Sequence, residues 1–214
     1  MATKGTSGKC LLCESVYSGT GMTKHLQSCL PKSIENQSKQ KKLRAKPFFH
    51  IMVRGAYAPD YWLHLKVDAK ARFQDLDQFL RDIWLECCGH MSAFRYGDHE
   101  LGMGRKCGDI LSPGMTLLHE YDFGTTTELS VKVIALHEGP MKRNKPIEIL
   151  ARNDPPEIAC DECGEALAVE ICTECQWDGE GWLCESCAED HSCDEEMRLP
   201  VVNSPRTGVC GYAG

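Results

Sequence analysis

The chain carries 14 cysteines in 214 residues, and most of them fall in Cys-x-x-Cys pairs. Two thiolates held by one tight turn are half of a tetrahedral zinc site, whereas a disulfide framework is typical of small secreted proteins. The first residues lack the apolar stretch of a secretory signal, and no apolar run approaches the roughly 18 residues that a membrane helix needs. We therefore expect a cytoplasmic protein that uses its paired thiols to bind zinc.

The first set of ligand candidates has the spacing of a zinc finger. A Cys-x-x-Cys pair is followed by a histidine and a cysteine four positions apart. A spacing of four places two side chains on one face of a helix, one turn apart, where they complete a tetrahedral site. We predict a Cys2HisCys finger over residues 1–31 with the ligands Cys10, Cys13, His25 and Cys29.

The C-terminal segment holds eight further candidates in four pairs. Eight such ligands suit two tetrahedral zinc ions, and no position is left open for water, so the predicted role of these ions is structural. We predict a two-zinc module over residues 157–214, whose core is too small to fold without metal. The chain would then hold about three zinc ions. The predicted ligands are Cys160, Cys163, Cys172, Cys175, Cys184, Cys187, His191 and Cys193.

The spacing leaves open how the four pairs share the two ions. It resembles that of B-box and RING-like modules, which implies a cross-brace: pairs one and three share one ion, and pairs two and four share the other. The alternative is a sequential ribbon, in which neighbouring pairs share an ion. Cys210 in the C-terminal tail is an alternative ligand to Cys193, and we expect that tail to pack back onto a domain.

The formal charge divides the chain at the same places as the cysteines. It is +7 over residues 1–46, −2 over residues 47–156 and −12 over residues 157–214. The basic finger and the polar segment 32–46, which we interpret as a flexible linker, predict contact with nucleic-acid phosphates or with a protein. The acidic module predicts a basic protein partner, because its charge repels nucleic acid. We expect no membrane partner, and the oligomeric state stays open.

The central residues 47–138 predict an α+β domain. Apolar residues at helical spacing indicate one main amphipathic helix over residues 73–84. The element order β-β-α-β-β-β gives a sheet with one helix across it, similar to a β-grasp, and the Pro-punctuated residues 139–156 form a second predicted linker. The predicted strands, of which the first two form a hairpin, cover residues 48–54, 62–67, 94–96, 115–119 and 129–136.

The central domain also resembles a known family, the plasmid pRiA-type ORF-three proteins, also labelled TnpR-like passenger proteins of insertion elements. The resemblance covers about residues 47–138 and rests on the opening hairpin, the helix at 73–84, the Phe-Arg-Tyr-Gly strand at 94–97 and the Tyr-Asp-Phe-Gly sequence at 121–124. Family members commonly follow that last sequence with an acidic pair, an aromatic residue and a histidine, whereas this chain has Thr-Thr-Thr-Glu-Leu at 125–129. The resemblance implies a prokaryotic or mobile-element context and no settled activity.

Two classes of function remain open. A non-enzymatic zinc-binding adaptor or regulator fits the closed ligand sets and the charge distribution. The competing class is an enzyme that acts on nucleic acid, with the central domain as catalytic core and acid–base or metal-binding groups gathered at a strand-end cleft. Cys87 and Cys88 are adjacent, so we interpret them as buried thiols and not as a shared metal site. The candidate catalytic groups are Asp98, His99, His119, Glu120 and Asp122.

Overall fold

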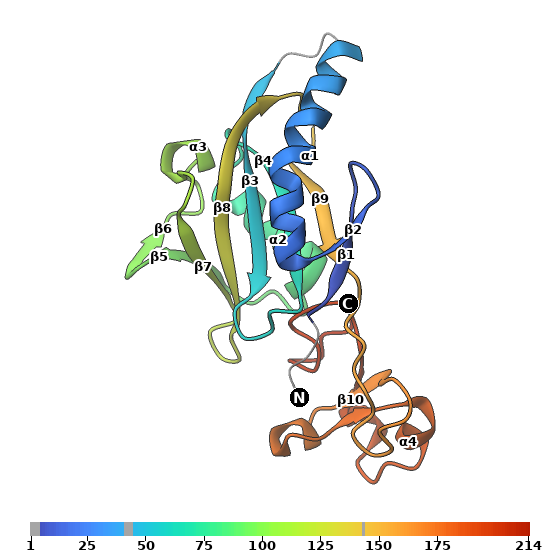
Figure 1. The fold of residues 1–214 in the computed structure, drawn as a ribbon. Coiled ribbons are helices and arrows are strands. Elements are labelled where there is room, and N and C mark those ends of the chain that lie inside the picture. Colours follow the sequence, from blue (N-terminus) through green and yellow to red (C-terminus); the bar gives the residue numbers. More distant parts are fainter. Residues whose placement is uncertain (1–4, 41–44, 143) are drawn as a thin grey trace.

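An antiparallel sheet of nine strands runs through most of the chain up to Asn153 (Figure 1). The computed structural model describes residues 5–40, 45–142 and 144–214. The strands are β1 (Ser7–Cys10), β2 (Val16–Ser18), β3 (Lys46–Gly55), β4 (Trp62–Asp68), β5 (Ser92–Tyr96), β6 (His99–Leu101), β7 (Thr116–Tyr121), β8 (Thr127–Gly139) and β9 (Ile147–Asn153). Their order across the sheet is β2-β1-β9-β4-β3-β8-β7-β5-β6. The predicted α+β class is confirmed, whereas the likeness to a β-grasp stays a prediction.

The predicted hairpin lies at the centre of this sheet as β3 and β4, which pair from Phe48 opposite Asp68 to Arg54 opposite Trp62. Because side chains alternate along a strand, β3 and β4 contribute to two cores. Residues such as Ile51 face the helix α2 (Phe73–Leu80). Phe48 and Trp62 face the helix α1 (Gly19–Gln40) on the opposite side of the sheet.

The helix predicted over residues 73–84 begins at Phe73, but its α-helical part ends at Leu80 and continues as one π-helical turn, Arg81–Leu85. The backbone N–H of Arg72 donates to the Asp75 carboxylate at 2.7 Å, which fixes the start of this helix. Within residues 47–138 it is the main helix, since α3 (Cys107–Ile110) has four residues, whereas the longer helix α1 precedes this range.

The basic segment predicted as a flexible linker over residues 32–46 is helical up to Gln40, where α1 ends. The reason is an apolar stripe at a spacing of four, which places one side chain per turn against the sheet. The polar residues around it hide this pattern, and Pro31 lies within the helix. Lys41, Lys42 and Arg44 of this segment lie outside the described residues. The stripe consists of Met22, Leu26, Leu30 and Ile34.

The second predicted linker, over residues 139–156, contains strand β9. This strand pairs with β4 on one side and with β1 of the predicted finger on the other. A Cβ atom at Gly8 would collide with the carbonyl oxygen of Arg152, so glycine permits the close approach of β1 to β9. The finger therefore extends the large sheet and does not stand apart from it.

A second, three-stranded sheet forms the C-terminal module, with the order β11-β10-β12. After Pro200 the chain returns to the large sheet, where Ser204, Arg206 and Tyr212 are buried, as we expect of a tail that packs back onto a domain. No helix of the described residues is long and apolar enough to cross a membrane. The remaining elements are α3 (Cys107–Ile110), β10 (Glu170–Cys172), a 3-10 helix (Cys175–Asp178), β11 (Trp182–Leu183), α4 (Glu185–Glu189), a 3-10 helix (Glu195–Met197) and β12 (Arg198–Pro200).

Candidate metal centres

Within the described residues, four groups of cysteine and histidine side chains are compact enough to hold a metal ion each. In every group the four ligand atoms, one from each residue, lie within 4.8 Å of one another. Three of these groups bring together all twelve residues that the spacing predicts as ligands, and the fourth is new. The groups are Cys10, Cys13, His25 and Cys29; Cys87, Cys88, His90 and Cys210; Cys160, Cys163, Cys184 and Cys187; and Cys172, Cys175, His191 and Cys193.

The N-terminal group is assembled from a strand end, a turn and a helix. Cys10 closes β1, and Cys13 lies in the turn that leads to β2. His25 and Cys29 lie one turn apart on α1, as the spacing predicts. The Sγ atom of Cys13 lies 3.2 Å from Nε2 of His25, and the sulfurs of Cys10 and Cys29 are 4.0 Å apart. The ring of Tyr17 stacks on His25 with the centroids 4.3 Å apart and orients the imidazole.

The thiols of this group differ in their readiness to ionise. Hydrogen bonding by Ser15 lowers the pKa of Cys13 to about 6. Burial raises the pKa of Cys29 to about 12. Without a cation, the Cys29 thiol keeps its proton beside the Cys13 thiolate, whereas a bound divalent ion releases this proton. The chemistry of the donor set thus suits a soft divalent metal such as zinc.

The two C-terminal groups have the arrangement of a cross-brace. Pair one meets pair three, with the sulfurs of Cys163 and Cys184 3.8 Å apart. Pair two meets pair four, where Sγ of Cys175 lies 3.5 Å from Nε2 of His191 and 3.7 Å from Sγ of Cys193. The described residues do not form the sequential ribbon, in which pairs one and two would share an ion.

The short sheet of the module produces this arrangement. Strand β10 pairs with β11 through Ile171 opposite Trp182, which turns pair three back toward pair one. Helix α4 begins after Cys184 and places Cys187 in its first turn. The core that supports the sheet is small, so the module depends on its ligand groups. Its buried residues outside the pairs include Ile171, Leu183 and Ala188.

A carboxylate links the two C-terminal groups. The Nδ1 atom of His191 lies 2.9 Å from Oε1 of Glu162, a residue inside the first Cys-x-x-Cys pair. Since Nε2 of the same ring faces the second group, Glu162 orients the imidazole as a partner of a metal-binding histidine does.

The backbone N–H of Cys163 donates to Cys160 and lowers the pKa of that thiol to about 6.

The candidate catalytic groups of the central domain are not brought together. His119 is fully buried on β7, and its Nε2 atom lies 2.8 Å from the carboxylate of Asp77. Its neighbour Glu120 points to the other side of the strand and pairs with Arg95. Asp122 pairs with Arg206 of the tail, whose guanidinium lowers the pKa of that carboxyl group.

Asp98 and His99 complete the set of candidate catalytic groups and lie apart from the other three. Both are exposed at the hairpin that joins β5 to β6. Among the described residues, none of the five belongs to a metal-binding group.

The fourth group differs from two predictions made from the sequence. Cys88 is exposed and Cys87 half-buried, and both belong to a compact Cys/His group, so the interpretation as buried thiols is wrong. Cys210 joins these two residues and does not replace Cys193. Two features of the sequence could have indicated this group. His90 lies two positions after Cys88, and Cys210 belongs to no Cys-x-x-Cys pair.

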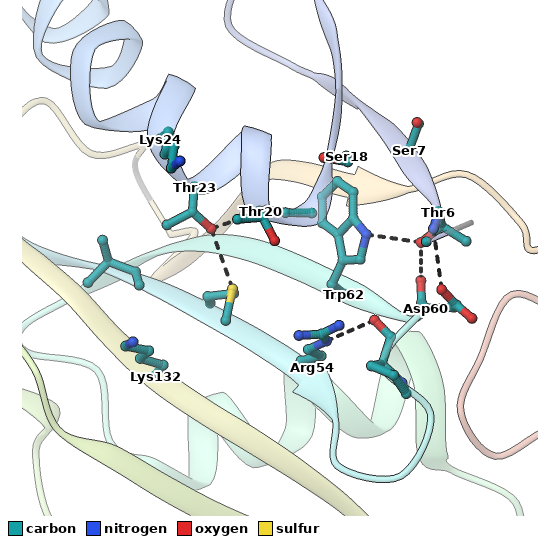
Figure 2. A pocket seen from close by; sticks show the side chains of 15 residues that line it. Thr6, Ser7, Ser18, Thr20, Thr23, Lys24, Arg54, Asp60, Trp62 and Lys132 are labelled. Atoms are coloured by element: carbon teal, nitrogen blue, oxygen red, sulfur yellow. Dashed lines mark hydrogen bonds between the residues drawn. The ribbon is translucent and has the colours of Figure 1, made fainter. Parts of the chain in front are cut away.

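A basic cavity lies between the N-terminal part of α1 and the sheet (Figure 2). Its volume is about 630 Å³. Figure 2 shows Lys24 of α1, Arg54 of β3 and Lys132 of β8 around it, with the indole of Trp62 in the wall. Of the described residues that line the cavity, Asp60 alone is acidic, and the backbone N–H of Thr6 donates to it at 3.3 Å. Three cations against one engaged carboxylate make the cavity suited to an anionic group.

Comparison with known proteins assigns no family to the chain. No protein-family model matches it, and no curated protein matches it. Among solved structures it is similar to a protein of unknown function from Methanosarcina mazei Go1, MM3350, with 16% sequence identity and a TM-score of 0.41 over 52% of this chain and 70% of that chain. The resemblance to the pRiA-type family therefore stays a prediction.

Proposed function

We propose that this protein is a non-enzymatic adaptor or regulator whose folded shape depends on zinc. The observation that carries the proposal is the gathering of all twelve predicted ligands into three groups of four. Four protein ligands occupy all four coordination positions of a tetrahedral zinc ion. No position is left for water or substrate, which favours a structural role for the ion. The competing proposal, an enzyme that acts on nucleic acid, has less support because three of the five candidate catalytic groups have separate partners and the other two lie exposed at a hairpin.

The acidic module is the proposed contact for a protein partner. Its formal charge of −12 over residues 157–214 favours a basic surface. Trp177, in the 3-10 helix of the module, is 78% exposed, and an exposed tryptophan is a frequent centre of protein interfaces. Val169 and Leu167 add further exposed apolar surface to the module.

The basic N-terminal region is the proposed contact for nucleic-acid phosphates. It combines the cavity lined by Lys24, Arg54 and Lys132 with the basic residues that follow α1. Phosphate contacts of this kind bind without reading sequence and weaken as salt rises. We further propose a cytoplasmic location and, from the family resemblance, a prokaryotic or mobile-element context.

Metal counting on single variants tests the structural zinc sites. Cys13→Ala, Cys163→Ala and Cys175→Ala each remove one exposed or half-buried ligand from a different group. Each variant should lose one zinc ion relative to the unaltered protein, because three ligands bind the ion more weakly. Cys107→Ala is the matched control, since Cys107 is the one cysteine outside the four groups. Full zinc content in all three variants would contradict the proposal.

Salt titration tests the nucleic-acid contact. Changing Arg54 and Lys132 to Gln should weaken binding to a random duplex and reduce the slope of log affinity against log salt. Changing Lys70 and Lys106, which lie outside the cavity lining, provides the matched control. Equal slopes for the two double variants would show that nucleic acid contacts another part of the protein and not this cavity.

A further inference from the structure

The fourth Cys/His group joins two distant parts of the chain. Cys87, Cys88 and His90 lie in the loop between the π-helical turn and β5, whereas Cys210 lies in the C-terminal tail. We propose that these four residues bind a zinc ion that fastens the tail to the large sheet, and we call this group the clasp site. The proposal adds a fourth ion to the three of the proposed function and rests on that function only for the identity of the metal.

The distances within the clasp site match those around one zinc ion. With Zn–S bonds of about 2.3 Å, two sulfurs of a tetrahedral site lie about 3.8 Å apart. The sulfurs of Cys88 and Cys210 are 3.8 Å apart, and those of Cys87 and Cys88 are 3.7 Å apart. The Nε2 atom of His90 lies 3.0 Å from Sγ of Cys88 and 3.2 Å from Sγ of Cys210. The site thus offers four ligand atoms with one common centre.

Contacts outside the site hold the 86–90 loop in place. The carboxylate of Glu86 accepts a hydrogen bond from the backbone N–H of Gly89 at 2.5 Å and another from the Tyr121 hydroxyl at 3.1 Å. Arg81 donates to the carbonyl oxygen of His90 at 2.6 Å. Hydrogen bonds from outside the site therefore position the loop that carries three of the ligands, as a defined metal site requires.

The tail adopts a strained conformation where it supplies the fourth ligand. Cys210 has a φ of 51°, in the left-handed region that residues other than glycine rarely occupy. Such strain persists when the surrounding structure fixes it, and it is common at functional sites. This backbone conformation directs the sulfur of Cys210 toward Cys88 and His90. Metal binding by Cys210 therefore explains why the left-handed conformation is kept.

The charge around the clasp site suits a zinc ion with three thiolates, which together carry one negative charge. Arg206 is fully buried, and its Nη2 atom donates to Sγ of Cys87 at 3.5 Å and to the Asp122 carboxylate at 2.7 Å. A buried guanidinium requires negative partners. A Cys87 thiolate bound to zinc provides one of them, and Asp122 provides the other.

The clasp site closes a loop that contains the whole two-zinc module. The chain leaves the large sheet after Asn153 and returns at Ser204, whose hydroxyl donates to the carbonyl oxygen of Trp84 at 2.6 Å. The module lies between these two points at one end of the large sheet (Figure 1). Zinc at the clasp site therefore secures the return segment 204–212 and limits the movement of the module relative to the sheet.

Native mass spectrometry of the full chain tests this proposal. The unaltered protein should carry four zinc ions, and Cys210→Ala should carry three. The control Cys107→Ala removes a cysteine outside all four groups and should keep four. Amide exchange should show faster exchange over residues 204–212 in Cys210→Ala and unchanged protection over residues 157–200.

Each other outcome contradicts the clasp site. Equal zinc content in Cys210→Ala and the unaltered protein would overturn it, as would a Cys88–Cys210 disulfide in place of the ion in the protein as purified. Three ions in the unaltered protein would overturn the clasp site alone, whereas the absence of zinc would overturn the proposed function as well. If Cys210→Ala does not fold, Cys88→Ala tests the same site, because Cys88 is an exposed ligand.

Discussion

The side-chain amide of Asn153 donates a 2.8 Å hydrogen bond to the side-chain oxygen of Asn203, 50 residues later in the chain. The amide of Asn203 donates in return to the carbonyl oxygen of Asn153 at 3.0 Å, and Arg152 donates to the carbonyl oxygen of Asn203 at 2.6 Å. Both ends of the two-zinc module are thus held side by side where β9 ends. The module is an insertion between β9 and the tail.

Chelation should unfold the module and leave the large sheet folded. Residues 160–200 have a small core of their own, whereas the sheet buries extensive apolar surface between β3, β4 and α2. Zinc binding supplies the folding free energy that a small core lacks. Amide exchange after treatment with a chelator should show lost protection over residues 160–200 and retained protection in β3 and β4. A uniform loss of protection along the chain is the contradicting result.

The cross-brace predicts which variants lose the same ion. Cys160 and Cys184 belong to one group, and Cys172 belongs to the other. Cys160→Ser and Cys184→Ser should each lose one zinc ion, and the double variant should lose no more than either alone. The comparison variant Cys160→Ser/Cys172→Ser should lose two. Metal counting under mild conditions distinguishes these outcomes, and an additive loss in the Cys160/Cys184 pair would support the sequential ribbon.

Removing the carboxylate of Asp122 should destabilise the protein strongly. Asp122→Asn leaves the buried Arg206 guanidinium without its carboxylate partner at 2.7 Å. Breaking a buried ion pair on one side costs about 3–5 kcal/mol. The matched control Asp98→Asn changes an exposed carboxylate and should shift the free energy of unfolding by less than about 0.5 kcal/mol. Urea unfolding of the zinc-loaded proteins measures both, and similar midpoints for the two variants would contradict the prediction.

Two buried histidines should make the protein less stable in mild acid. The Nε2 atom of His50 lies 2.9 Å from Nδ1 of His64, under helix α1. Burial lowers the pKa of His50 to about 3 and that of His64 to about 4. The unfolded chain binds these protons near pH 6.5, so the free energy of unfolding falls as the pH drops from about 6.5 toward 4.

Variants separate this effect from the protonation of metal ligands, which also destabilises at low pH. Each histidine that is buried in the neutral form should contribute up to about 1.4 kcal/mol of lost stability per pH unit. His50→Gln should therefore reduce the slope of unfolding free energy against pH between 6.5 and 4. His99→Gln changes an exposed histidine and should leave the slope unaltered. An unaltered slope in His50→Gln would count against the prediction.

The metal groups were predictable where the ligands are close in sequence. The spacing of His25 and Cys29 already implies one helical turn, and each Cys-x-x-Cys pair implies one tight turn. The clasp site was not predictable in this way. It depends on the contact of Cys210 with Cys88, which are 122 residues apart, and on the burial of Arg206 between Cys87 and Asp122.

The strands with alternating apolar residues were also predictable, whereas two elements inside the predicted linkers were not. The extension of α1 beyond Pro31 depends on one apolar side chain per turn, such as Ile34, among polar neighbours. Strand β9 lies between two segments that contain proline, and it is stable because β4 and β1 pair with its two edges. Tertiary pairing of this kind leaves little trace in local sequence.

X-ray absorption at the zinc edge of the purified, unaltered protein tests the central claim most directly. The four groups together offer thirteen cysteines and three histidines. We predict zinc neighbours that are mostly sulfur at about 2.3 Å, with a minor nitrogen component at about 2.0–2.1 Å. A shell of oxygen and nitrogen without sulfur, or a protein that contains no zinc, would contradict it.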